Sequence, residues 1–278
     1  MRIKSIVITA LISLGSFLSG YKGRNFIRQN VYLPIRSSQK YFDIISPYKK
    51  TYCPKNAITI AIFGQSNSAN EMTEKSDISI PSNLYQYDWK SKGCYLYKEP
   101  LLGASGIKGN VITYTATKMA NIYNKPIVIV PFGGGGTSVL QWAYGDLSYR
   151  HQLVMKRVKE SGLHPRIFLW HQGESDANLS EEVYYIALRK VVGSTFNSFP
   201  KSLFGIALAT RCKNKPWNPI RSAQKRVSQD MPRSFITADS DKIIGLDKRP
   251  DNCHFSAKGA SELGNLYYET ITRELEMN

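Results

Sequence analysis

The chain has 278 residues, of which 42% are hydrophobic and 12% aromatic. This content is enough for one substantial hydrophobic core, which excludes a wholly disordered chain. The sequence contains no internal repeat, so it does not indicate a solenoid. The formal charge of +16 favours anionic partners such as acidic glycans or membrane surfaces, although a solvated basic surface explains it equally well.

The first 20 residues have the pattern of an export signal. Residues 1–4 are cationic, residues 5–20 are uncharged and largely apolar, and positive charge returns at Lys22. Sixteen apolar residues fall short of the roughly 20 that span a bilayer, but no Ala-x-Ala cleavage site is present. We therefore expect export to the periplasm, to the medium or to the outer face of a membrane. Residues 1–20 act either as a cleaved signal peptide or as a membrane anchor, and the sequence does not decide between the two.

Residues 21–56 are basic and carry only scattered apolar side chains, so we predict a basic N-terminal stem. The catalytic domain is expected to cover residues 57–278. Four cysteines fit an exported chain with disulfides, and none forms a Cys-x-x-Cys pair. We favour Cys53 with Cys94 and Cys212 with Cys253, because the last two are expected in loops at one edge of the domain; free buried thiols are the alternative.

Short apolar runs alternate with amphipathic segments from residue 57 onward. Such alternation predicts parallel strands joined by helices, in a three-layer α/β/α sandwich with a mainly parallel five-stranded sheet. The expected strands are 58–63, 126–131, 166–170, 203–209 and 234–238. The expected helices are 110–124, 147–161, 180–197, 219–229 and 256–274. Residues 71–109 read as an irregular insertion beside the first strand.

Three polar motifs contain the side chains of a serine hydrolase. They are Gly-Gln-Ser-Asn at 64–67, His-Gln-Gly-Glu-Ser-Asp at 171–176 and Asp-Asn-Cys-His at 251–254. The first two directly follow expected strands, whose carboxyl ends form the ligand edge of a parallel sheet. Ser66 is the candidate nucleophile and His254 the candidate base. A turn-capping serine and a structural histidine are the alternatives.

These motifs, with serine early and Asp-x-x-His late, resemble the SGNH (GDSL-like) hydrolase superfamily in its sialate O-acetylesterase and carbohydrate acetylesterase branch. The resemblance covers residues 57–270 and implies a flavodoxin-like sandwich. It implies that Asp251 orients His254, while Glu174 is the second candidate for that role. No Gly-x-Ser-x-Gly elbow occurs, which argues against the α/β-hydrolase fold.

The resemblance also implies three donors for an oxyanion. They are the Ser66 N–H, a glycine N–H in the run 133–136, and the side-chain amide of Gln172. Within the glycine run Gly135 is preferred and Gly136 is the next choice. The Gln form of the second motif, in place of Asn, matches the carbohydrate acetylesterase branch.

Other chemistries fit the chain less well. The glycine run lacks the Lys of a phosphate loop and the last Gly of a dinucleotide fingerprint. His171 and Glu174 have no third partner at a metal-binding spacing, so neither a metal nor a cofactor is expected. Nucleic acid is not an expected partner. The tryptophans 142, 170 and 217 are expected mainly in the core, with sugar stacking as the alternative.

The sequence thus predicts a serine esterase that removes O-acetyl groups from a carbohydrate through an acetyl-serine intermediate. The expected substrate is sialic acid or an acetylated polysaccharide, and the positive charge favours an anionic one. Two alternatives remain at this point, an O-acyltransferase with the same residues and a glycan-binding module without activity. An N-terminal anchor would add a membrane tether.

Overall fold

The structure, a computed structural model, describes residues 45–213 and 216–277. The chain divides into two compact units, Met1–Lys49 and Lys50–Asn278, and only residues 45–49 of the first are described. The predicted signal segment and most of the predicted stem therefore lie outside the described residues. The last residues of the stem, from Lys50 onward, belong to the second unit. Among the described helices, none combines the length and apolarity that crossing a bilayer requires.

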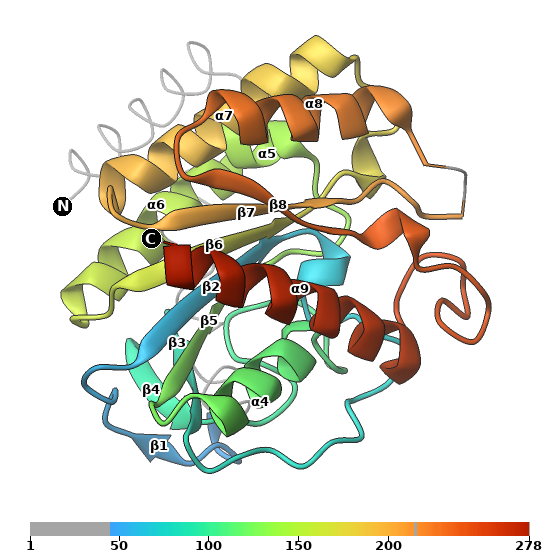
Figure 1. The fold of residues 1–278 in the computed structure, drawn as a ribbon. Helices are drawn as coiled ribbons and strands as arrows, with labels where there is room; N and C mark the ends of the chain where they lie inside the picture. Colours follow the sequence, from blue (N-terminus) through green and yellow to red (C-terminus); the bar gives the residue numbers. More distant parts are fainter. Residues whose placement is uncertain (1–44, 214–215, 278) are drawn as a thin grey trace, which may run out of the picture. The chain divides into compact units, whose positions relative to one another are not determined.

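A mainly parallel sheet runs through the second unit, in the order β1-β4-β3-β5-β2-β6-β7-β8 (Figure 1). Its strands are β1 (Lys50–Thr51), β2 (Ile58–Gly64), β3 (Leu84–Asp88), β4 (Gly93–Leu96), β5 (Ile127–Pro131), β6 (Pro165–His171), β7 (Leu203–Leu208) and β8 (Ser234–Asp239). Only the pairings of β4 with β1 and with β3 are antiparallel. All five predicted strands are confirmed, and three further strands extend one edge.

The three further strands correct the prediction for the edge of the sheet. β3 and β4 lie in residues 71–109, which were expected to be irregular. β3 pairs in parallel with β5 and turns directly into β4. Their sequences, LYQYD and GCYL, are short and mix polar with apolar residues. They therefore lack the continuous Ile, Val and Leu content that identifies a strand covered on both faces.

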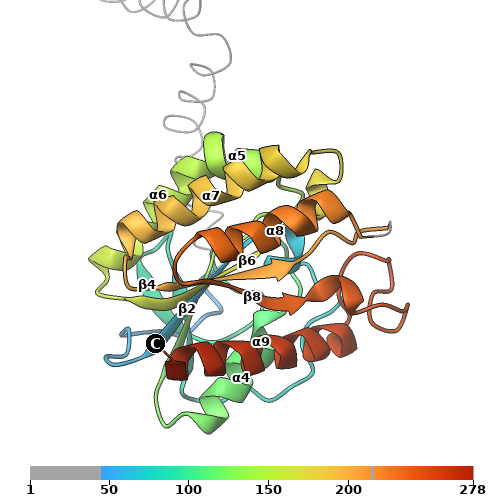
Figure 2. The ribbon, with the colours of Figure 1, turned by 45° about the horizontal axis from the view of Figure 1, so that its top comes forward.

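Helices cover both faces of the sheet, as the three-layer prediction required (Figures 1 and 2). α4 and α9 pack together on one face, and the other four helices pack on the opposite face. They are α4 (Ile112–Ile122), α5 (Val139–Tyr144), α6 (Asp146–Glu160), α7 (Glu181–Ser198), α8 (Asn218–Asp230) and α9 (Ala257–Met277). Only α5 was not predicted. It is a short helix that Ser138 begins with a capping box.

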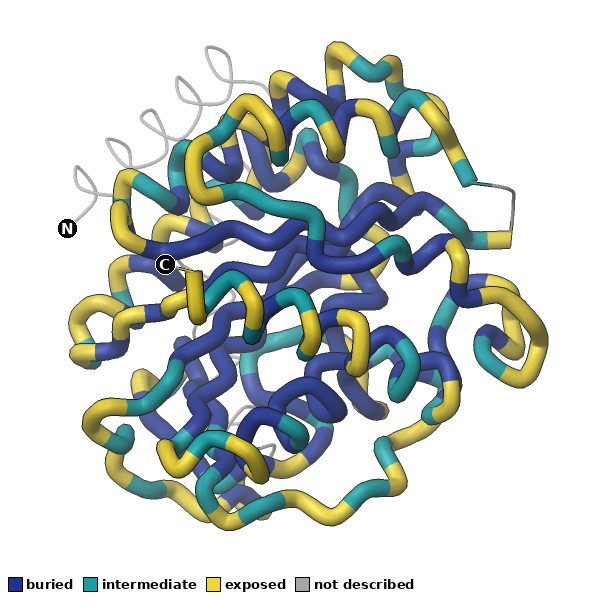
Figure 3. The backbone as a smooth tube through the Cα atoms, viewed as in Figure 1, coloured by how far each residue is buried: buried dark blue, intermediate teal, exposed yellow. Residues whose placement is uncertain are grey.

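Strand β2 divides the core into two halves, because successive side chains of a strand point to opposite faces. Ile60 and Ile62 pack with α4 and α9, whereas Ala61 and Phe63 pack with α5 to α8. Figure 3 shows this buried centre between the exposed outer faces of the helices. The Phe63 ring stacks on Phe132 with centroids 4.6 Å apart. This packing fixes the end of β2, where the first polar motif begins.

Both predicted disulfides are confirmed. Cys53 bonds to Cys94 and so ties the segment before β2 to β4. Cys212 bonds to Cys253 and so ties the loop after β7 to the loop that carries the last polar motif. No free cysteine occurs in the part of the chain that the structure describes.

Candidate active site

Ser66 lies at the carboxyl end of β2, as predicted. It begins a short 3-10 helix, η2 (Ser66–Ser68), directly after the strand. Gly64 permits this turn, because its φ is +127° and a Cβ there would overlap the carbonyl oxygen of His171. The Gln65 N–H donates to the same carbonyl, at 3.0 Å. The Ser66 side chain is therefore held at the ligand edge of the sheet.

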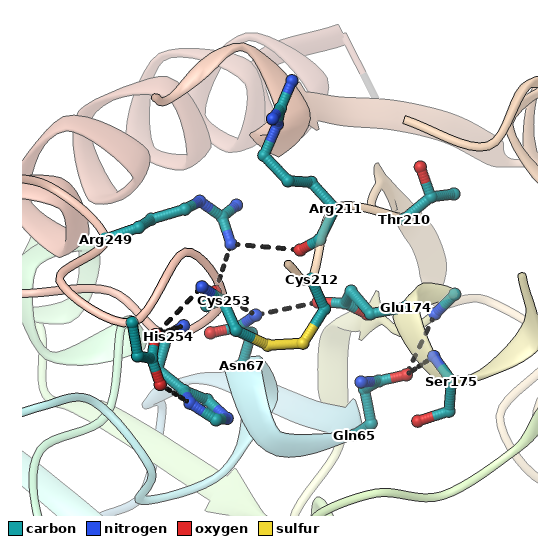
Figure 4. Close-up of a disulfide and its surroundings, with 12 residues drawn as sticks. Gln65, Asn67, Glu174, Ser175, Thr210, Arg211, Cys212, Arg249, Cys253 and His254 are labelled. Carbon is teal, nitrogen blue, oxygen red and sulfur yellow. Dashed lines mark hydrogen bonds and ion pairs between the residues drawn. A yellow bond between two sulfur atoms is a disulfide. The ribbon is translucent and has the colours of Figure 1, made fainter. Parts of the chain in front are cut away.

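Gln65 joins the first polar motif to the second. Its Oε1 accepts from the backbone N–H of Ser175 at 3.0 Å and of Gly173 at 3.3 Å (Figure 4). Gly173 has a φ of +152°, and a Cβ would overlap the carbonyl oxygen of Ala209. The two motifs follow the adjacent strands β2 and β6, so the strand order brings them together.

His254 and Asp251 form a hydrogen-bonded pair. The Nδ1 of His254 lies 2.7 Å from Oδ2 of Asp251. Oδ1 of the same carboxylate accepts from the backbone N–H groups of His254 and Cys253, at 2.7 Å and 2.9 Å. Burial alone would raise the pKa of Asp251, but the bonds from His254 and Cys253 hold it below its ordinary value. The arrangement leaves Nε2 of His254 as the nitrogen that can face a nucleophile.

Asn67 brings the third motif against the first. Its side-chain Nδ2 donates to the carbonyl oxygen of Cys253 at 3.2 Å and to Oε1 of Glu174 at 2.8 Å (Figure 4). Asn67 follows Ser66, and Cys253 precedes His254. The two candidate catalytic side chains are therefore attached to residues that touch each other.

Glu174, the second candidate for orienting His254, contacts other groups. It lies in η3 (Glu174–Asp176) after β6 and is 8% exposed. Its Oε1 lies 3.4 Å from Nε2 of His171, whose Nδ1 lies 2.8 Å from the Tyr267 hydroxyl. Oε1 also accepts from Nδ2 of Asn67, and among the described residues no contact joins Glu174 to His254. Of the two carboxylates, only Asp251 is bonded to His254.

The pKa of Glu174 gives a testable pH dependence. Burial alone would raise this pKa, but the hydrogen bonds from His171 and Asn67 keep it below the ordinary value of 4.5. The folded state therefore binds fewer protons than the unfolded state, so stability is present above about pH 4.5 and is lost as the pH falls through the lowered folded-state pKa. We expect the melting temperature to fall on acidification below pH 4.5, and to fall less steeply in Glu174→Gln. Equal slopes for the two proteins would contradict this origin.

The predicted oxyanion donors differ in their surroundings. The side chain of Gln172 is fully buried, and its Nε2 donates to Asp176, Thr137 and Gln65 at 2.6, 3.0 and 3.2 Å. Its Oε1 accepts from the Tyr184 hydroxyl at 2.9 Å. Both amide hydrogens thus have internal acceptors in this structure, and the role of Gln172 as an oxyanion donor stays a prediction. The side chain ties η3 to the glycine run.

The glycine run reaches the site from the end of β5. The Gly134 N–H donates to the carbonyl of Gly64 at 3.0 Å. Gly135 is exposed, but its N–H donates to the Ser105 hydroxyl at 2.8 Å. That hydroxyl in turn donates to Oε1 of Glu71 at 2.7 Å. The preferred glycine donor therefore has an acceptor on an exposed surface, and Gly136 next to it is exposed as well.

The sequence interpretation missed two residues next to this site, Asn67 and Arg249. Asn67 stood inside a quoted motif, so its position beside Ser66 was the available signal. Arg249 is 2% exposed and carried no signal, because its partners are backbone carbonyls distant from it in the sequence or in its own loop, those of Arg211, Ser240, Ile243 and Cys253. Trp142 and Trp170 lie in the core as expected, whereas Trp217 is 42% exposed. Across residues 45–213 and 216–277, no group of three His, Cys, Asp or Glu side chains is arranged to hold a metal ion.

Comparison with protein families gives a match over residues 60–273 to the carbohydrate esterase, sialic acid-specific acetylesterase family. The chain belongs to this family. It is therefore a carboxylic ester hydrolase of the carbohydrate esterase class, and the resemblance inferred from its motifs is confirmed. Comparison with curated proteins finds no match.

Solved structures share the fold. A protein of Arabidopsis thaliana aligns with a TM-score of 0.62 at 20% identity, over 78% of this chain and 98% of that chain. A carbohydrate acetylesterase from Xanthomonas citri aligns with a TM-score of 0.58 at 14% identity, over 79% and 56%. A family two carbohydrate esterase from Clostridium thermocellum, in complex with cellohexaose, gives 0.53 at 13% identity, over 81% and 67%. These similarities support the SGNH-type sandwich of this family member.

Proposed function

We propose that this carbohydrate esterase is a serine O-acetylesterase with Ser66 as nucleophile, His254 as base and Asp251 as the group that orients His254. The observation that carries the proposal is the hydrogen bond between Asn67 and Cys253, at 3.2 Å, because it joins the neighbours of Ser66 and His254. The 2.7 Å bond between His254 and Asp251 supports the same assignment. It gives Nδ1 the proton and leaves Nε2 to accept one.

The reaction follows from these positions. The Oγ of Ser66 attacks the acetyl carbonyl carbon while Nε2 of His254 takes the hydroxyl proton. The tetrahedral intermediate collapses, the C–O bond to the sugar breaks, and His254 returns the proton to the leaving sugar oxygen. Water, deprotonated by His254, then attacks the carbonyl carbon of the acetyl-serine. The bond from this carbon to the Ser66 Oγ breaks, His254 returns the proton to that oxygen, and acetate is released. The imidazolium formed in each step is stabilised by the Asp251 carboxylate.

Two backbone donors are proposed for the oxyanion. The Ser66 N–H stands at the start of η2, beside the attacking hydroxyl. The Gly135 N–H becomes available when the substrate oxygen replaces the Ser105 hydroxyl, which lies 2.8 Å from it on a half-exposed loop. Loss of one such donor typically lowers kcat by about 10²–10³-fold. Gln172 takes no part in this proposal.

The substrate is proposed to be an O-acetylated sialic acid or another acetylated, anionic glycan. The family description names sialic acid, and the formal charge of +16 favours an acidic sugar over a neutral one. Export, by a signal peptide or an anchor in residues 1–20, remains a proposal that rests on the sequence pattern alone.

Acetate release from a panel of acetylated glycans tests the proposal. The panel contains acetylated sialic acid, an acidic polysaccharide and neutral acetylated xylan, with the deacetylated sugars as added acceptors. We expect the highest kcat/KM on an acidic substrate, with a decline at high salt because charge attraction is screened. Preference for xylan at all salt concentrations would overturn the anionic assignment. Acetyl transfer to the added acceptor in place of acetate release would identify an acyltransferase.

A further inference from the structure

The carbonyl oxygen of Cys253, directly before His254, accepts hydrogen bonds from two buried side chains. Nδ2 of Asn67 donates to it at 3.2 Å from one side, and Nη1 of Arg249 makes a short hydrogen bond from the other (Figure 4). The disulfide to Cys212 fixes the side chain of the same residue. The backbone next to His254 is thus held at three points.

One donor, Asn67, is neutral and contacts a carboxylate, whereas the other donor, Arg249, is itself cationic. Asn67 is fixed by the Glu174 carboxylate, 2.8 Å away. Among the described residues, the guanidinium of Arg249 has no carboxylate within hydrogen-bond distance. It donates to backbone carbonyls, at 2.8 Å to Ser240 and 3.0 Å to Ile243, and lies 3.8 Å from the centre of the Phe255 ring. The chain Glu174, Asn67, Cys253 carbonyl and Arg249, here termed the Cys253 junction, therefore carries a negative group at one end and a positive group at the other.

The Glu174 charge favours the charged form of Arg249 across the junction. Burial lowers the pKa of Arg249 to about 10, and the Glu174 charge is the foremost influence that opposes this decrease. The other oxygen of Glu174, Oε2, is buried and has no hydrogen-bond partner among the described residues. Burying such groups is costly, and neutral side chains would often serve folding as well. A purely structural role therefore gives a poor account of the two charges.

We propose that Glu174 and Arg249 are positioning residues, which act through Asn67 and the Cys253 carbonyl to fix His254 relative to Ser66. The proposal rests on the proposed function, because it concerns the distance between those two side chains. Asn67 directly follows Ser66 in the chain and is hydrogen-bonded to Cys253, the residue before His254. A displacement of about 1 Å between reacting groups costs about 10²-fold in rate.

The test uses Asn67→Ala, Glu174→Gln and the double variant of the full chain. Asn67→Ala removes the donor to Cys253, whereas Glu174→Gln keeps an acceptor for Asn67 and removes only the charge. Active sites are counted by titration with a fluorophosphonate, so that kcat refers to folded, competent enzyme. For an aryl acetate we expect Asn67→Ala to lower kcat by about 10²-fold, with KM nearly unchanged. Glu174→Gln should lower kcat less.

The double variant tests whether both residues act through one chain of contacts. If they do, the loss in kcat for the pair is smaller than the product of the two single losses. Glu99→Gln is the matched control, because Glu99 is also 8% exposed, accepts from the Asn110 and Ser76 N–H groups, and among the described residues has no hydrogen bond to Asn67 or Cys253. We expect this control to lose stability without losing kcat per titrated site.

Full kcat per titrated site in Asn67→Ala, or multiplicative losses in the double variant, would overturn the Cys253 junction as a positioning device. A rise in KM without a fall in kcat would do the same. Failure of the proposed function has a different outcome, in which the parent protein neither reacts with the fluorophosphonate at Ser66 nor releases acetate.

Discussion

Ser66→Ala is expected to lower kcat for acetyl ester hydrolysis by about 10⁶-fold, as removal of the nucleophile does in other serine hydrolases. The hydroxyl lies in η2 at the end of β2, and the next residue, Asn67, is hydrogen-bonded to the loop that carries His254. Its loss leaves no oxygen to form the acetyl-enzyme. The measurement is acetate release at saturating substrate, together with mass spectrometry of the trapped acyl-enzyme.

Folding should be unaffected, because no hydrogen bond of the Ser66 hydroxyl to another described residue contributes to the turn. Ser68→Ala is the matched control. The Ser68 hydroxyl donates to the Gln65 carbonyl at 2.7 Å and is buried, so this variant should melt at a lower temperature but keep its chemistry. Residual activity of Ser66→Ala above about one hundredth of the parent's activity would refute the nucleophile assignment, because another group would then have to act as the nucleophile.

Asp251→Asn is expected to lower kcat by about 10⁴-fold, the loss found when the carboxylate of a catalytic triad becomes an amide. Oδ1 accepts from two backbone N–H groups, so the loop geometry is retained with an amide oxygen in this place. The amide nitrogen then faces Nδ1 of His254, which stabilises the wrong tautomer. The activity is measured as kcat/KM across pH, because the imidazole must be unprotonated to act.

Comparison with Glu174→Gln separates the two carboxylates. If Glu174 oriented His254, its substitution would cost as much as the loss at Asp251, whereas we expect a much smaller effect. Asp247→Asn serves as control in the same loop region, because Asp247 pairs with Lys258 on the exposed surface and lies away from the His254 side chain. A loss in Asp247→Asn equal to that in Asp251→Asn would indicate general disturbance of the loop.

Much of this site follows from the sequence because its parts are local. Strand β2 is a continuous apolar run that ends at Gly64, and Asp251 and His254 lie three residues apart. Both can be recognised without knowledge of distant contacts. The pairing of Cys212 with Cys253 was predicted correctly because the loops after β7 and β8 meet at the same edge of a parallel sheet.

The remaining features depend on contacts between distant residues. Gln172 has the residue type of an oxyanion donor, but Asp176, Thr137 and Tyr184 determine that its amide is used internally. Arg249 has the appearance of a surface residue in an exposed loop, yet its guanidinium is buried among carbonyls. Strands β3 and β4 escape recognition because their partners, not their composition, make them strands.

The Cys212–Cys253 bond encloses a ring of chain that contains all of α8 and β8. Cleavage of the backbone anywhere inside this ring leaves the two pieces covalently joined. A protease that cuts after the exposed Lys213 thus yields a nicked protein with unchanged mass on a non-reducing gel. The segment that carries His254 stays fastened to the end of β7, and only a reductant releases it.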